Sequence, residues 1–215
     1  MDVAPTTPAP LLIACALGIE RLALRGGDRG SARGPVTILR TGMGPKAAER
    51  AITGRLADPA FADAAVLATG FCAGLAPGMH PGDLVVAEET WVLRGVVTPC
   101  VATKRLVKEL VRAVPGRTIH TGPLTGSDHV VRGQERSDLF ATGAIAVDME
   151  SAVTLHSAVR SGARPVAAVR VVVDAPEHEL VRIGTVRGGI SAFRVLRAVI
   201  PAYYEWHRSL LLPRR

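Results

Sequence analysis

Residues 166–174 read Val-Ala-Ala-Val-Arg-Val-Val-Val-Asp, and this stretch decides the fold prediction. Its first eight residues are apolar except for Arg170 and are rich in β-branched valine. Such a run predicts a strand that is buried on both faces, as strands of parallel sheets are. Asp174 would stand at the carboxyl end of this strand, where α/β sheets place functional groups.

Other apolar runs on either side alternate with segments of helical spacing, and most connections between them are short. The further strands are expected at 11–17, 36–40, 64–69, 83–87 and 118–124. Helices are expected at 19–24, 46–56, 101–114, 148–160 and 190–212, the last with a bend at Pro201. Glycine turns are expected at 41–45 and 70–74. This alternation predicts a three-layer α/β fold with a mostly parallel or mixed central sheet flanked by helices. We expect a single domain over residues 11–215, preceded by a flexible, proline-rich arm at residues 1–10.

The composition of the 215-residue chain excludes several classes of protein. Hydrophobic residues make up 48% and charged residues 21%, which supports a sizeable core and excludes a disordered chain. Three unpaired cysteines argue against a disulfide scaffold and for a reducing cytoplasm. The spacing of cysteine and histidine fits no metal site, so we expect no metal. The longest apolar stretch, residues 11–19, is too short to span a bilayer.

The net charge of +7 points to an anionic partner. The basic residues are scattered and have no aromatic residues between them, so we do not expect nucleic-acid binding. An anionic substrate and an anionic membrane surface both remain compatible with this charge.

Residues 42–47 read Gly-Met-Gly-Pro-Lys-Ala and lie between an expected strand and an expected helix. The pattern fits a dinucleotide fingerprint, but the next expected strand ends at Thr69 without the acidic residue that such a site needs. A loop that binds another anion or a hydroxyl-bearing ligand at the helix N-terminus is one alternative. A purely structural turn is the other.

Glu20 and Asp174 follow expected strands, and Asp148 and Glu150 stand where an expected helix begins. Each of these carboxylates has a structural and a functional interpretation. Glu20 is either an exposed helix residue or a group placed beside a site. In Val147-Asp148-Met149-Glu150-Ser151, the carboxylates either cap a helix or act on a ligand. Asp174 is either a turn residue or a general acid, because burial raises the pKa of a carboxyl group. Cys72 is either a nucleophile or a small buried filler.

Taken together and in this order, the motifs resemble the nucleoside phosphorylase superfamily, including the methylthioadenosine/S-adenosylhomocysteine nucleosidases. The resemblance runs from about Leu11 to about Glu177. The matching segments are Ala16-Leu17-Gly18-Ile19-Glu20, Thr41-Gly42-Met43-Gly44, Thr69-Gly70-Phe71-Cys72-Ala73-Gly74-Leu75-Ala76, Pro81-Gly82-Asp83-Leu84-Val85-Val86, Ala146-Val147-Asp148-Met149-Glu150-Ser151-Ala152 and Arg170-Val171-Val172-Val173-Asp174.

The resemblance implies an enzyme that cleaves the N-glycosidic bond of a purine nucleoside. Asp174 would protonate the leaving base and Glu20 would activate the attacking water. Glu150 would bind the ribose hydroxyls, with Met149 against the sugar, and His129 and Val130 would lie near the base. The other expected substrate-binding residues are Gly44, Cys72, Gly74 and Arg170. No metal or organic cofactor is implied, although phosphate could be a co-substrate.

Three departures from the family pattern bear on the reaction. Val173 replaces the serine before the acid, and Ala73 replaces the first glycine of a pair. Ala68 stands where purine and uridine phosphorylases carry a phosphate-binding arginine. Together with Glu20, Ala68 favours hydrolysis over phosphorolysis, although Arg40, Arg94 or Arg170 could serve an anion.

The short chain and its apolar and basic tail, residues 210–215, are similar to the hopanoid-associated phosphorylases. This branch implies removal of adenine from an adenosyl-lipid by a cytoplasmic protein in peripheral contact with an anionic membrane. A methylthioadenosine-type nucleosidase and a futalosine hydrolase are alternatives, and a non-catalytic nucleoside-binding protein is an alternative of another class. Family members commonly form homodimers or larger homo-oligomers, so we expect one here.

Overall fold

The computed structural model describes residues 9–28, 32, 34–92, 95–175 and 184–211. The strands are β1 (Leu11–Cys15), β2 (Val36–Arg40), β3 (Ala65–Gly74), β4 (Leu84–Val92), β5 (Val96–Pro99), β6 (Ile119–Gly126), β7 (Ala146–Asp148) and β8 (Val166–Asp174). The helices are α1 (Gly18–Arg25), α2 (Pro45–Leu56), α3 (Thr103–Ala113), α4 (Gln134–Ala141), α5 (Ser151–Arg160), α6 (Gly184–Ala198) and α7 (Ile200–Leu210), with a short 3-10 helix at Pro59–Phe61. Most of the expected N-terminal arm (1–8) and of the basic tail (212–215) lies outside the described residues.

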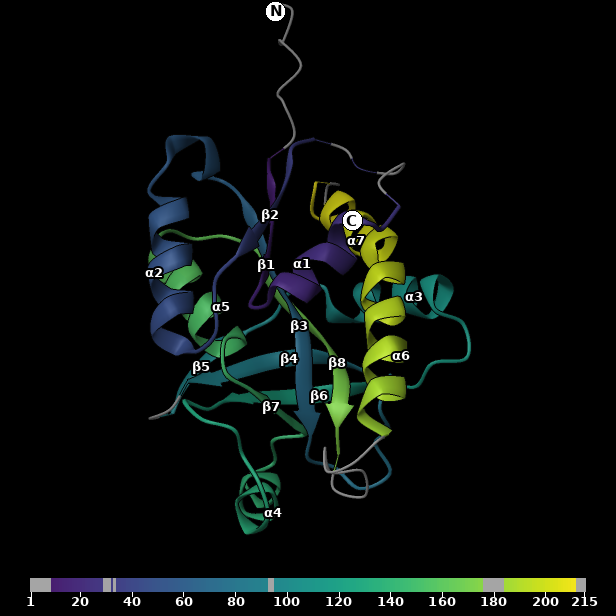
Figure 1. Cartoon of the computed structure of the whole chain (residues 1–215). Coiled ribbons are helices and arrows are strands. Elements are labelled where there is room, and N and C mark those ends of the chain that lie inside the picture. Colours follow the sequence, from purple (N-terminus) through teal and green to yellow (C-terminus); the bar gives the residue numbers. More distant parts are fainter. Residues whose placement is uncertain (1–8, 29–31, 33, 93–94, 176–183, 212–215) are drawn as a thin grey trace, which may run out of the picture.

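The strands form a mixed sheet in the order β2-β1-β3-β7-β6-β4-β5, and β8 pairs with both β3 and β4. The β1–β2, β1–β3, β3–β8, β4–β6 and β6–β7 pairs are parallel. The β3–β7, β4–β8 and β4–β5 pairs are antiparallel. Helices cover both faces of the sheet (Figure 1). The predicted three-layer α/β fold with a mixed sheet is therefore confirmed.

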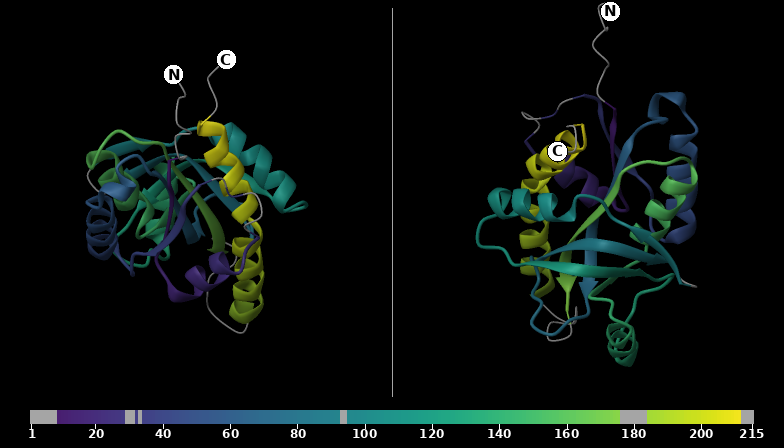
Figure 2. Two further views of the ribbon diagram at one scale, coloured as in Figure 1. Left: turned by 90° about the horizontal axis from the view of Figure 1, so that it is seen from above. Right: turned by 180° about the vertical axis from the view of Figure 1, so that it is seen from behind.

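The strands send alternate residues to two hydrophobic cores, because successive side chains of a strand point to opposite faces. On β8, Ala167, Val169 and Val171 join the core that α1, α3, α6 and α7 cover. Val166, Ala168 and Val172 join the core under α2 and α5. Figure 2 shows these two groups of helices on opposite sides of the sheet. Arg170 has the same parity as the second set, so it interrupts the face under α5.

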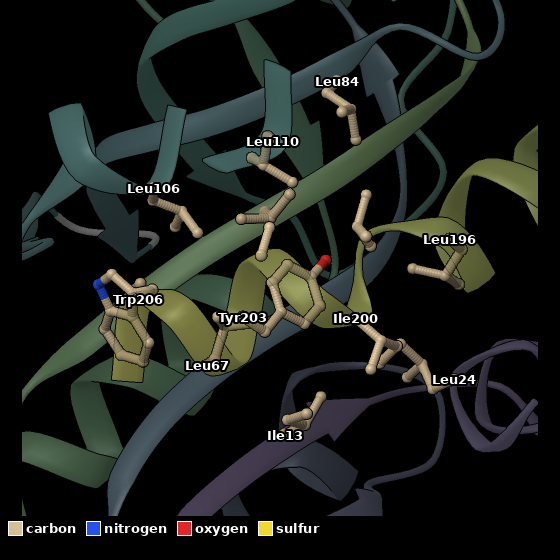
Figure 3. Packing of buried hydrophobic residues seen from close by; sticks show 14 of the residues in the cluster. Ile13, Leu24, Leu67, Leu84, Leu106, Leu110, Leu196, Ile200, Tyr203 and Trp206 are labelled. Atoms are coloured by element: carbon tan, nitrogen blue, oxygen red, sulfur yellow. The ribbon is translucent and has the colours of Figure 1, made fainter. Parts of the chain in front are cut away.

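Helix α7 is part of the first core (Figure 3). Its Tyr203 and Trp206 are fully buried and lie among leucines of α3 and of the sheet. The Tyr203 hydroxyl makes a 2.7 Å hydrogen bond with Oγ1 of Thr69, and the Trp206 Nε1 donates to the carbonyl of Val101. The C-terminal helix thus supports β3 directly behind the segment that leads to the cavity described below.

Three expectations about local structure were wrong. One helix with a bend was expected at 190–212, but the structure has two helices, α6 and α7, separated at Val199. They are separate because Pro201 favours the first turn of a new helix. The expected glycine turn at 70–74 is part of β3, which continues to Gly74. The helix expected at 148–160 begins only at Ser151, and residues 146–148 form β7. The sequence did not predict β5 and β7, which have only four and three residues, or the largely polar helix α4.

Gly70 allows β3 to pass close to two charged side chains. A Cβ at this position would lie 2.4 Å from Oε1 of Glu20 and 2.5 Å from Nη1 of Arg170, and its φ is +137°. Since both neighbours are buried and hydrogen-bonded, neither can move away cheaply. We expect Gly70→Ala to lower the free energy of unfolding by about 2 kcal/mol or more.

Urea unfolding followed by the fluorescence of Trp91 and Trp206 measures this change. The control is Gly54→Ala in α2, where a Cβ would meet no atom within 4 Å. It should raise stability by about 0.5–1 kcal/mol, because alanine is the better helix former. Equal stability of the two variants would contradict the close approach at Gly70.

Candidate active site

A cavity of about 250 Å³ lies at the carboxyl ends of β1, β3 and β8 and beside the turn between β7 and α5. Its charged lining comes from Glu20, Asp148, Glu150, Asp174 and His129. Its apolar lining includes Leu17, Met43, Phe71, Val130, Val131, Val147, Met149 and Val173. The fold therefore gathers the four carboxylates singled out in the sequence around one mainly apolar space.

Glu20 is fixed by backbone amides from two segments. Its Oε2 accepts hydrogen bonds from the backbone N–H groups of Ala16 (2.9 Å) and Leu17 (2.8 Å), which precede α1. Its Oε1 accepts from the backbone N–H of Phe71 on β3, at 2.8 Å. Glu20 is buried rather than an exposed helix residue. The carboxylate thus caps α1 and at the same time faces the cavity.

Glu150 stands at the N-cap position of α5 and reaches across to the glycine loop before α2. Its Oε1 accepts a 2.8 Å hydrogen bond from the backbone N–H of Gly44. Burial raises the pKa of Glu150, and nearby Asp148 and Glu20 add to the rise, while Arg170 and the Gly44 hydrogen bond oppose it. The glycine turn at 41–45 is therefore one wall of the same site, and Gly44 positions a carboxylate with its backbone.

Asp148 confirms the capping interpretation of this segment. Its Oδ1 accepts hydrogen bonds from the backbone N–H groups of Glu150 (3.1 Å) and Ser151 (2.9 Å), which open α5. These bonds satisfy donors that a helix start would otherwise leave unpaired. Met149, between the two carboxylates, lines the cavity.

Arg170 lies behind the cavity and is only 1% exposed. It pairs with Asp148 through Nε (2.5 Å) and donates to the Ser151 hydroxyl and to the carbonyl of Thr69. Burial alone would lower the pKa of Arg170, but the carboxylates of Asp148, Glu20 and Glu150 outweigh it, and the net direction is upward. Arg170 is not among the residues that line the cavity, so its contact with the site runs through these neighbours.

Asp174 is buried at the end of β8, and its Oδ2 forms an ion pair with Nη2 of Arg136. Arg136 belongs to α4 and is itself buried. Nothing in the sequence pointed to Arg136, because no helix is expected at α4 and one arginine in a polar segment carries no signal. The structure therefore adds a guanidinium to the surroundings of Asp174, for which the local sequence predicted only burial.

The remaining expected residues lie in different places around the cavity. His129 lines the mouth, where its ring nitrogens contact Asp128 and Glu135. The hydrogen bond with Asp128, and next that with Glu135, raises the pKa of His129. Val130 also lines the mouth. Cys72 lines the interior, and burial raises the pKa of its thiol, which favours the buried filler over the nucleophile. Gly74 does not line the cavity; it packs against Met79.

Among the described residues, no group of three or more His, Cys, Asp or Glu side chains is arranged to hold a metal ion. None of the helices in the described part of the chain is long and apolar enough to cross a bilayer.

Solved structures with this fold were found at low sequence identity. The methylthioadenosine/S-adenosylhomocysteine nucleosidase of Neisseria meningitidis, in complex with methylthio-immucillin-A, has a TM-score of 0.71 and 18% identity, over 94% of this chain and 99% of that one. The S-adenosylhomocysteine nucleosidase of Streptococcus pyogenes has a TM-score of 0.73 and 16% identity, over 96% and 99%. A futalosine hydrolase mutant of Helicobacter pylori has a TM-score of 0.72 and 14% identity, over 91% and 98%. No curated protein sequence matches the chain.

A family model described as the phosphorylase superfamily matches residues 29–201, which is most of the chain. The fold and this match define the class: the protein is an enzyme that cleaves glycosidic bonds. The chain belongs to the phosphorylase superfamily, and the resemblance seen in its sequence is thereby confirmed.

The raised pKa of Glu150 predicts that ionisation of this side chain lowers the free energy of unfolding, and that the loss depends on pH. Because the pKa lies above its ordinary value of 4.5 only in the folded protein, ionisation favours unfolding. The stability that Glu150 contributes is thus fully present below that value and is lost as the pH rises. We expect Glu150→Gln to raise the Tm at neutral pH by about 2–4 °C.

Thermal unfolding at a series of pH values measures the effect. The gap between the variant and the wild type should close as the pH falls towards 4.5, the ordinary value. Exposed Glu49 supplies the control, and Glu49→Gln should show little change at any pH. A gap that did not depend on pH would show that charge burial is not its cause.

Proposed function

We propose that this enzyme hydrolyses the N-glycosidic bond of an adenine nucleoside that carries an apolar group on its 5′ carbon. The observation that carries the proposal is the meeting of Glu20, Glu150 and Asp174 in one largely apolar cavity. Cleavage of this bond develops positive charge on the sugar and negative charge on the base. Carboxylates near the sugar stabilise the positive charge, and an acid near the base neutralises the negative charge by protonation.

Each carboxylate has a role in this proposal. Asp174 donates a proton to the base nitrogen N7 while the C1′–N9 bond breaks and its electron pair stays with the base. Glu20 accepts a proton from the water whose oxygen bonds to C1′. Glu150 binds the ribose hydroxyls, and its raised pKa reflects how far its surroundings exclude water. Met149 packs against the sugar, and His129 and Val130 lie near the base.

Water is favoured over phosphate as the nucleophile. Ala68, where the phosphate-binding arginine of phosphorylases would stand, is buried within β3. The carboxylates of Glu20 and Glu150 would repel a phosphate dianion that entered the cavity. The buried guanidinium of Arg170 is already committed to Asp148, Ser151 and Thr69.

The apolar 5′ group is supported by the mouth of the cavity. Met43, in the glycine loop that Glu150 contacts, is 69% exposed although it lines the cavity. An apolar substituent that left the cavity at this point would cover it. An adenosyl-hopanoid is therefore our preferred substrate. Methylthioadenosine, with its small thioether, and futalosine are the alternatives, in line with the nucleosidases and the futalosine hydrolase that share the fold.

A membrane-linked substrate also fits the net charge of +7, which would hold the protein at an anionic surface. We infer peripheral contact of this kind, and a homo-oligomer in solution. Sedimentation with phosphatidylglycerol vesicles at low and high salt tests the first inference, and light scattering tests the second.

Release of free base, measured by chromatography, tests the proposed reaction. The substrates are adenosine, methylthioadenosine, S-adenosylhomocysteine, inosine, futalosine and an adenosyl-hopane, each with and without phosphate. We expect adenine from the adenosyl-hopane without any need for phosphate. If adenine were released only from methylthioadenosine, that compound and not the lipid would be the substrate. If release required phosphate, the reaction would be phosphorolysis and not hydrolysis. No base from any substrate would favour a nucleoside-binding protein.

Asp174→Asn should lower kcat by about 10²–10⁴-fold, because the amide cannot donate the proton that the leaving base needs. The affinity for the product base should change much less. Steady-state kinetics on the best substrate of the panel and calorimetry with adenine provide the two values. Unchanged turnover in this variant would rule out Asp174 as the general acid.

A further inference from the structure

Helix α4 connects the two ends of the cavity through consecutive residues. Arg136 forms the ion pair with Asp174 inside the cavity, while Glu135 hydrogen-bonds to His129 at the mouth, at 3.0 Å. Arg136 is the only buried residue of α4, and Leu139 adds partly buried apolar contact. In Figure 1, α4 lies beyond the arrowheads of β3 and β8, away from the layers of the sheet. The Arg136 contact is therefore a large part of what holds α4 to the body.

The buried guanidinium of Arg136 is poorly satisfied. Arginine has five N–H donors. Here Nη2 donates to Asp174, and Nε has only a long contact of 3.4 Å to the carbonyl of Val131. Nη1 is buried without a hydrogen-bond partner among the described residues. Buried donors without partners carry a free-energy cost that solvent would remove. The ion pair can thus be exchanged for another partner of Asp174 more cheaply than a fully bonded one.

The proposed reaction requires such an exchange. To donate a proton to a purine, Asp174 must be a neutral acid, and a neutral acid does not attract the guanidinium as a carboxylate does. The base and Arg136 therefore need Asp174 in different protonation states. They also compete for hydrogen bonds to the same carboxyl group.

We propose that Arg136 is an internal competitor of the base: it occupies Asp174 in the empty site and leaves it when a purine binds. This inference rests on the proposed function. Arg136 is a positioning residue, because it acts on the substrate only through Asp174. Its release would also loosen α4, so that the binding of the base is coupled to the position of one helix.

The decisive variant is Arg136→Met, which keeps a long apolar side chain but removes the charge. Calorimetry should show adenine binding at least threefold more tightly than in the wild type, and KM should fall in the same direction. Arg136→Lys retains a cation and should remain close to the wild type. Arg132→Met, which removes an exposed charge four residues earlier, is the matched control and should leave both values unchanged.

The same substitution in the Asp174→Asn variant completes a double-mutant cycle. In that variant Arg136 has no carboxylate for which to compete, so adding Arg136→Met should change the affinity for adenine by less than twofold. Weaker or unchanged binding of adenine to the single variant Arg136→Met, which keeps Asp174, would overturn the proposal. That result is expected if Arg136 helps the base to bind instead of competing with it.

Hydrogen–deuterium exchange of the wild type makes the test independent of how well the variants fold. Adenine should speed exchange in residues 134–141 if Arg136 is released, whereas slower exchange there would contradict the release. The failure of the proposed function is recognised separately: the wild type would then neither bind adenine nor release it from any nucleoside.

Discussion

The buried positive charge of Arg170 organises the end of the sheet beside the cavity. It interrupts the apolar face of β8, and a guanidinium buried there is tolerable only if carboxylates and hydrogen-bond acceptors surround it. Asp148, Ser151 and Thr69 meet this need, and they belong to three different segments. The end of β7, the middle of β3 and the start of α5 are thereby held against β8. Because Arg170 needs all three partners, it fixes the relative positions of the elements that build the cavity.

The carboxylates of the cavity differ because their partners differ. Glu20 is held by three backbone amides, Glu150 by one amide in a dry environment, and Asp174 by the guanidinium of Arg136. In the proposed reaction, carboxylates with such different partners would serve as base, sugar ligand and acid within one small space. The glycines are part of this design, because Gly44 offers its amide to Glu150 and Gly70 lets β3 approach Glu20 and Arg170.

A feature could be predicted from the sequence when it depends on neighbouring residues, but not when it depends on residues far apart along the chain. Long apolar runs such as 166–173 are local signals, so the layers of the fold were predictable. A common site for Glu20, Glu150 and Asp174 was implied by the resemblance to the superfamily, because local patterns give each carboxylate a structural interpretation as well as a functional one. Strands of three or four residues, such as β7, owe their existence to pairing with distant strands, and no local pattern marks them. The same holds for Arg136, whose partner is 38 residues away. The reading of Gly70–Gly74 as a turn failed because the glycines there serve close packing inside a strand rather than a reversal of the chain.

Glu20 has a consequence for the way relatives of this enzyme are interpreted. Its carboxylate satisfies amides of both the α1 start and β3, so the fold needs this residue whether or not a substrate is ever cleaved. A descendant that lost its activity would still be under selection to keep Glu20. Its presence in a related sequence is therefore poor evidence for catalysis. In our proposal the pairing of an aspartate at the end of β8 with an arginine on α4 is a more informative mark, because the exchange of its partners acts on the binding of the base.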